Sequence, residues 1–218
     1  MGTLWIEVFG FSVRAPVTAG TNLLLAIQCL VSCRLLSLSS SERHRMWSGF
    51  FLLMALATLA GAFKHGARHL MTEEWLLVVL ALSNLGSAVA TYFAQRAAIV
   101  SYSAPQWRAS YHGLVGLQLG LFVLMNIAWG PELMILIVSM AIGLIPVLVV
   151  EGIHARHLPG AGLVSAGLTI SAASGLVYVV PVSLDPWLNH IDIAHVIMSG
   201  SLVLVLVGVR RSGGVSWT

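Results

Sequence analysis

The sequence is poor in charged residues. Asp, Glu, Lys and Arg make up 9% of its 218 residues, whereas hydrophobic residues make up 58% and the mean hydropathy is +0.91. Because a soluble domain carries roughly a quarter charged residues, this composition excludes an ordinary soluble protein. Several apolar runs reach the ~20 residues that a helix needs to cross a bilayer. We therefore expect an all-α integral membrane protein with no long soluble domain.

Lysine and cysteine are also scarce. The single lysine, Lys64, lies at the end of a predicted helix and not in the last one, which excludes a retinal Schiff base there. Cys29 and Cys33 are four residues apart in one apolar run, a helical spacing poorly suited to a disulfide, and we interpret them as packing residues. The net charge of +3 comes from arginines near helix ends. That pattern indicates membrane topology, and we expect no nucleic-acid partner.

Seven apolar stretches predict a seven-helix bundle in a single domain, residues 1–218. They cover residues 16–37, 46–70, 73–96, 111–130, 132–155, 160–182 and 190–209. Residues 97–110, where Ser-Tyr-Ser-Ala-Pro interrupts the apolar sequence, are expected to form a loop, although the third span could run on to about Tyr102.

The basic residues predict the orientation, because cytoplasmic loops carry an excess of Lys and Arg. With the N-terminus outside and the C-terminus in the cytoplasm, eight of the eleven basic residues lie inside. The inside set is Arg34, Arg43, Arg45, Arg96, Arg108, Arg156, Arg210 and Arg211, and the outside set is Arg14, Lys64 and Arg68. The preference for arginine and the compact loops favour a bacterial inner membrane.

Two groups of polar residues fall at the outer end in this topology. His65 closes the second span, and His190, Asp192 and His195 open the seventh. Ionisable groups at membrane depth are costly and usually mark function. Asp192 and His195 are three apart and share a helix face, whereas His190 joins them only if the chain is non-helical at its start, where Asn189 or Asp192 could cap the helix.

If the second and seventh spans are neighbours, these residues predict a zinc site. His65, His195 and either His190 or Asp192 would supply three ligands and leave a fourth position open for water, which is the form of a catalytic zinc centre. Such a zinc lowers the pKa of its bound water to about 7. An aspartate beside it could orient a ligand or move a proton.

This arrangement resembles the seven-helix superfamily of the alkaline ceramidases and the progestin and adipoQ receptors. The matching residues are His65 in Gly-Ala-Phe-Lys-His-Gly and His195 in Asn-His-Ile-Asp-Ile-Ala-His, a form most like uncharacterised bacterial relatives. The resemblance implies a zinc ion held by His65, His190 and His195. It also implies hydrolysis of a lipid amide or ester, with Asp192 as the catalytic acid or base.

The chain departs from that pattern at three positions. The family's last-span histidines are four apart, whereas His190 and His195 are five apart and Ile191 fills the expected position. Gly61 stands where the family has a serine, and Leu76 where it has an aspartate. Metal binding tolerates these differences better than hydrolysis does.

Two other interpretations stay open. The chain could be a non-catalytic subunit or receptor-like binder in a larger membrane complex, in contact with lipid and partner subunits. It could also bind a b-type haem through His65 and His195. No role is assigned to His69, His112, His154 or His157. The last two lie in the final turn of a predicted helix, where the helix dipole favours them, and Glu151-x-x-His154 lacks the second copy that a di-iron bundle requires.

Overall fold

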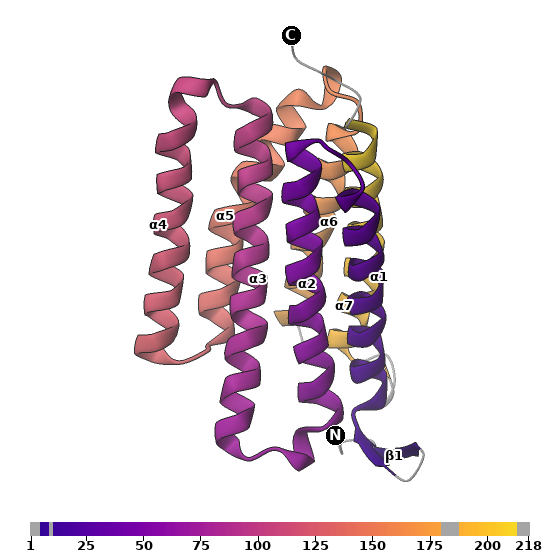
Figure 1. Ribbon diagram of the computed structural model, residues 1–218. Coiled ribbons are helices and arrows are strands. Elements are labelled where there is room, and N and C mark those ends of the chain that lie inside the picture. The colour runs from indigo at the N-terminus through magenta and orange to yellow at the C-terminus, as the bar shows by residue number, and fades with distance from the viewer. Residues whose placement is uncertain (1–4, 9–10, 180–187, 213–218) are drawn as a thin grey trace.

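In the part of the chain that the structure describes, seven antiparallel helices form an up-and-down bundle (Figure 1). A computed structural model describes residues 5–8, 11–179 and 188–212. The helices are α1 (Pro16–Ser37), α2 (Glu42–Gly66), α3 (Glu73–Tyr102), α4 (Pro105–Trp129), α5 (Leu133–Ile153), α6 (Ala161–Val179) and α7 (His190–Ser212), with 3-10 turns η1 (Arg68–Leu70) and η2 (His154–Arg156). Six are long and apolar enough to cross a membrane, and α6 has a shorter apolar stretch. The all-α prediction is confirmed.

A short antiparallel hairpin precedes the bundle. It consists of β1 (Trp5–Val8) and β2 (Phe11–Arg14), in register from Trp5 opposite Arg14 to Val8 opposite Phe11. We call the end of the bundle that carries it the hairpin end; α7 finishes at the opposite, C-terminal end (Figure 1). The sequence analysis had not predicted strands here.

Helix boundaries follow local signals. Pro16 and Pro105 occupy first-turn positions, where a missing N–H costs nothing. The loop predicted over residues 97–110 is too long, whereas the alternative that the third span runs on to about Tyr102 is confirmed. α3 ends at Tyr102, and only residues 103 and 104 separate it from α4. The second span begins at Glu42, four residues earlier than predicted. Residues 180–182 of the predicted sixth span lie outside the described residues.

Packing is uneven around the bundle. α1 packs against α2 and α7, α6 packs against α7, and α3 packs against α2 and α5. α4 lies at the edge (Figure 1) and buries only Val115 and Phe122. α2 has a small contact with α7, to which His44 Nε2 contributes by lying 2.9 Å from the Val209 carbonyl at the C-terminal end. At the hairpin end, polar contacts with Thr21 and Asn22 join α1 to His195 of α7.

Candidate functional site

His195 is buried at the hairpin end and hydrogen-bonded to a side chain of α1. It is 8% exposed, and its Nδ1 lies 3.0 Å from Thr21 Oγ1 and 3.5 Å from Asn22 Nδ2. The single hydroxyl hydrogen of Thr21 points to the Thr18 carbonyl at 3.1 Å. The shorter of the two contacts is therefore satisfied when His195 Nδ1 carries the proton and donates to Thr21, and in that tautomer the 3.5 Å contact with Asn22 Nδ2 is not a hydrogen bond. This tautomer leaves Nε2, for which no partner is found among the described residues, as a hydrogen-bond acceptor.

Asp192 lies one turn before His195 and is completely buried. Its Oδ2 accepts a hydrogen bond from the Asn189 amide at 3.0 Å, while Asn189 Oδ1 accepts from the amides of Ile191 and Asp192 at 2.8 and 3.3 Å. The two side chains form a reciprocal cap on α7, so the predicted capping role of Asn189 is confirmed. The other oxygen, Asp192 Oδ1, has no hydrogen-bond partner among the described residues.

The cap has a consequence for His190. Because α7 is helical from His190 onward, the step of five positions from His190 to His195 turns the chain by about 500°, which puts the two rings about 140° apart around the axis. The unwound start that would have brought His190 beside His195 is absent from the described part of α7. His190 itself makes interactions within the protein.

His65 reaches the same end of the bundle from α2. One turn before it, Gly61 faces α1 so closely that a Cβ there would lie 2.7 Å from Asn22 Oδ1. His65 is within electrostatic range of His195, of Lys64 and of Arg14 from the hairpin. The prediction that His65 and His195 lie at one end of the bundle is therefore confirmed, with α1 contributing Thr21 and Asn22 to the same cluster.

This cluster does not form a three-ligand metal centre. Over residues 5–8, 11–179 and 188–212, no group of three or more His, Cys, Asp or Glu side chains could hold a metal ion. His65, His190 and His195 therefore do not fit zinc as described, and one oxygen of Asp192 is occupied by the helix cap. Zinc, haem and the catalytic role of Asp192 stay predictions from the sequence.

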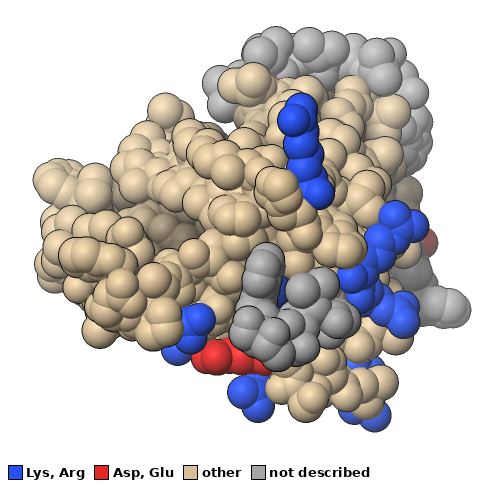
Figure 2. Space-filling model, turned by 90° about the horizontal axis from the view of Figure 1, so that it is seen from above, with Lys and Arg blue, Asp and Glu red and all other residues tan. Residues whose placement is uncertain are grey.

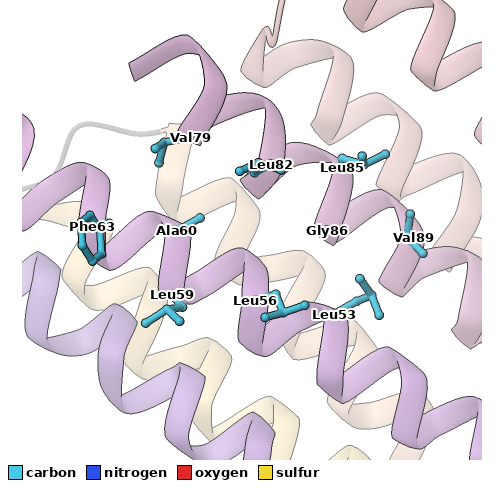
Figure 3. A pocket seen from close by; sticks show the side chains of 10 residues that line it. All are labelled: Leu53, Leu56, Leu59, Ala60, Phe63, Val79, Leu82, Leu85, Gly86 and Val89. Carbon is cyan, nitrogen blue, oxygen red and sulfur yellow. The ribbon is translucent and has the colours of Figure 1, made fainter. Parts of the chain in front are cut away.

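A groove between α2 and α3 is lined by apolar residues (Figure 3). It has a volume of about 490 Å³ and is lined by residues such as Leu56, Phe63 and Leu82. Two helix positions differ by about 200°, so Phe63 points away from the face that carries Gly61 and His65. The groove thus lies on the other side of α2 from the polar cluster and offers no hydrogen-bonding side chain.

A second polar cluster, missed by the sequence analysis, lies at the C-terminal end. Arg43 Nη2 lies 2.7 Å from Glu151 Oε1. The Arg43 side chain of this ion pair is 8% exposed and the Glu151 side chain 0%. Tyr102 donates its hydroxyl to Glu151 Oε2 at 2.6 Å. Arg43 Nη1 also donates to Ser101 Oγ at 2.8 Å and to the Tyr102 hydroxyl at 3.2 Å. These contacts join the ends of α2, α3 and α5.

A pocket of about 440 Å³ adjoins this second cluster between α3, α4 and α5. Its lining includes Tyr102, Trp107, Tyr111, Pro146 and His154. The His154 ring stacks on Tyr102 at 4.3 Å between centroids, and its Nδ1 lies 2.8 Å from the Val150 carbonyl. His154 is thus part of a ring stack beside the buried ion pair, and not merely a surface residue of the helix end.

No curated protein and no solved structure matches the chain. One family model matches residues 17–213, which extend from the first turn of α1 to just beyond the end of α7. The match covers the whole bundle and omits the hairpin. The chain therefore belongs to this family, which is described as a family of unknown function (DUF6962).

Proposed function

We propose that the protein is a multi-pass membrane protein, with its hairpin end outside the cell and its C-terminal end in the cytoplasm, that binds a lipid-like ligand at the polar cluster of the hairpin end. The ligand would carry an amide or hydroxyl group in its polar part. Binding would use His195 and Asp192 and would need no metal ion.

The charge distribution supports the orientation. Among the described residues, the C-terminal end carries eight arginines and two glutamates, Glu42 and Glu151. Figure 2 views this end, on which Lys and Arg side chains outnumber Asp and Glu. The hairpin end carries three basic residues and five acidic ones, namely Glu7, Glu73, Glu74, Glu132 and Asp192. The positive-inside rule places the arginine-rich end in the cytoplasm.

The observation that carries the binding proposal is the unused oxygen of Asp192. A buried carboxylate oxygen without a partner costs about 1–3 kcal/mol or more, and Asp192 Oδ1 has none among the described residues although the side chain is fully buried. A ligand N–H or O–H would satisfy it. His195 Nε2, one turn further along the same face, offers a second acceptor at the same end of the bundle.

Hydrolysis is less well supported than binding. The reaction predicted from the family resemblance requires a metal ion to activate water, and the described residues gather no group of three metal-binding side chains. A neutral His195 with Nδ1 held by Thr21 has the arrangement of either a metal ligand or a general base. His195 can accept a hydrogen bond from a lipid without binding a metal ion and without acting as a base.

The test compares two lipids that differ only in whether the amide nitrogen carries a hydrogen or a methyl group. A ceramide and its N-methylated analogue are titrated into the purified protein in detergent, with bound lipid measured by native mass spectrometry. The proposal expects the ceramide to bind and the N-methyl form to bind about tenfold more weakly, as expected when a buried acceptor loses its donor. Equal binding would exclude the amide N–H as the donor to Asp192 Oδ1.

Asp192→Asn provides the matching protein variant. Its side-chain oxygen would keep the bond from the Asn189 amide and its NH₂ would replace Oδ1, so a donor would face the ligand's donor. We expect ceramide binding to fall while folding is kept, and the exposed Glu74→Gln at the same end to change nothing. Release of fatty acid that depends on His195 would instead support hydrolysis.

A further inference from the structure

The pocket at the C-terminal end is open to the surroundings and has aromatic side chains at its mouth. Trp107 and Tyr111, on the first two turns of α4, are 57% and 45% exposed. α4 packs weakly on α5, and the exposed Pro146 of α5 also lines the pocket. Tryptophan and tyrosine rings at a helix end are typical of the membrane headgroup level, where one part of the ring is apolar and another is polar.

The interior of this pocket suits a hydrocarbon chain. Ala98, Ile99, Val147 and Val150 line it from α3 and α5. The nearby carboxylate of Glu151 is enclosed by Arg43 and Tyr102 and is fully buried, so it presents no negative charge to an occupant. The volume of about 440 Å³ accommodates part of a chain, while the remainder would extend into the bilayer between α4 and α5.

Two arginines lie close in sequence or in space to residues that line the pocket. Arg108 follows Trp107 and lies over the connection between α3 and α4, where its Nε and Nη2 donate to the carbonyls of Ser103 and Val100 at 3.2 and 3.0 Å. Ser103 itself lines the pocket. On the α5 side, His154 lines the pocket and the exposed Arg156 follows two residues later. Basic pockets between membrane helices on the cytoplasmic side suit anionic lipid headgroups.

We propose that this pocket binds one anionic phospholipid, with an acyl chain between α3, α4 and α5 and its phosphate beside Arg108 at the rim. The site is distinct from the hairpin-end cluster, which lies at the other end of the bundle. The lipid would close the gap that weak packing leaves between α4 and α5. Its assignment to the cytoplasmic leaflet rests on the orientation proposed above, whereas the binding itself does not.

The experiment measures lipid retained by purified protein in detergent, so its result is independent of orientation. Delipidated protein is incubated with phosphatidylglycerol or phosphatidylcholine of identical chains, and bound lipid is counted by native mass spectrometry. We expect one phosphatidylglycerol to be retained in preference to phosphatidylcholine. Equal retention of the two lipids would overturn the proposal.

Variants locate the site and separate charge from folding. Arg108→Gln should reduce phosphatidylglycerol retention about fivefold, the effect of one basic residue beside an anionic headgroup, whereas Arg108→Lys should keep the preference. Arg34→Gln, at the same end on α1, is the charge-matched control and should have no effect. A loss shared by Arg108→Lys or by Arg34→Gln would contradict a site at this rim.

Quenching of tryptophan fluorescence by brominated lipid gives a second measurement. It does not depend on a variant that has lost lipid binding. Phosphatidylglycerol brominated along its chains should quench the fluorescence of Trp107. The Trp107→Phe variant should therefore lose more of the quenching than Trp129→Phe, which alters a tryptophan at the other end of α4 that is at least as exposed. Equal quenching losses in the two variants would overturn the assignment of the chain to this pocket.

Discussion

Arg43 of α2 and Glu151 of α5, 108 positions apart in the chain, form an ion pair of 2.7 Å with both side chains buried. Tyr102 of α3 donates a 2.6 Å hydrogen bond to the second carboxylate oxygen. Each charge is acceptable in the interior only because the other is present. The pair therefore ties three helices together at one end and makes each dependent on the position of the others.

Removing one partner of this pair should strongly destabilise the bundle. Arg43→Ala leaves the Glu151 carboxylate buried and uncompensated, at a cost of about 3–5 kcal/mol. The free energy of unfolding, measured by denaturant titration in detergent, should fall by this amount. The exposed Arg45→Ala, two residues along the same helix, should change it little.

The double variant Arg43→Met/Glu151→Leu tests the cause. Replacing a buried ion pair by apolar residues is often neutral, so the double variant should be more stable than Arg43→Ala alone. If it is as unstable as the single variant, packing around Arg43, and not its charge, holds this end together.

The helices were predictable because each is a long apolar run, and the bounds of the first predicted span match α1 at both ends. The ion pair was not predictable from these apolar runs. Arg43 and Tyr102 lie where sequence analysis placed loops, and an arginine beside a membrane helix is already explained by topology. Only the packing of α2, α3 and α5 brings these residues to Glu151.

The hairpin-end cluster was predicted in part. A histidine and an aspartate in an apolar helix indicate burial by themselves, and Asp192 and His195 are buried. Their partners, however, come from α1, and Thr21 and Asn22 are ordinary polar residues in an apolar run. The three-histidine prediction required an irregular start to α7, which the cap between Asn189 and Asp192 prevents.

Substitution by alanine should change the stability of the bundle differently at two glycines of α6. A Cβ at Gly167 would lie 2.7 Å from the Ser201 carbonyl oxygen and 2.8 Å from Val205 Cγ2 of α7. Gly167→Ala would therefore force α6 and α7 apart, at a cost of about 1–3 kcal/mol. At Gly175, a Cβ meets nothing within 4 Å, so Gly175→Ala should be neutral or stabilising by up to about 1 kcal/mol. Thermal unfolding of both variants in detergent checks this difference.

The orientation predicts which residues a reagent outside the cell can reach. Single cysteines are introduced at the exposed Glu74 of the hairpin end and the exposed Ser40 of the C-terminal end, after both native cysteines are replaced. In intact cells, an impermeant maleimide should label Glu74→Cys, and should label Ser40→Cys only after lysis. The reverse pattern would invert the proposed topology and place the lipid pocket in the outer leaflet.

Metal analysis distinguishes the proposed binder from the zinc hydrolase that the family resemblance implies. Because the described residues gather no three-ligand group, we expect protein purified without chelator to contain far less than one zinc per chain. Ceramide binding should then be unaffected by a chelator, since it depends on His195 Nε2 and Asp192 Oδ1 alone. His65→Ala serves as the comparison: it removes a predicted zinc ligand but leaves the two proposed lipid contacts in place, and it should retain most of the binding. Stoichiometric zinc that is lost in both His65→Ala and His195→Ala would refute metal-free binding and favour the hydrolase.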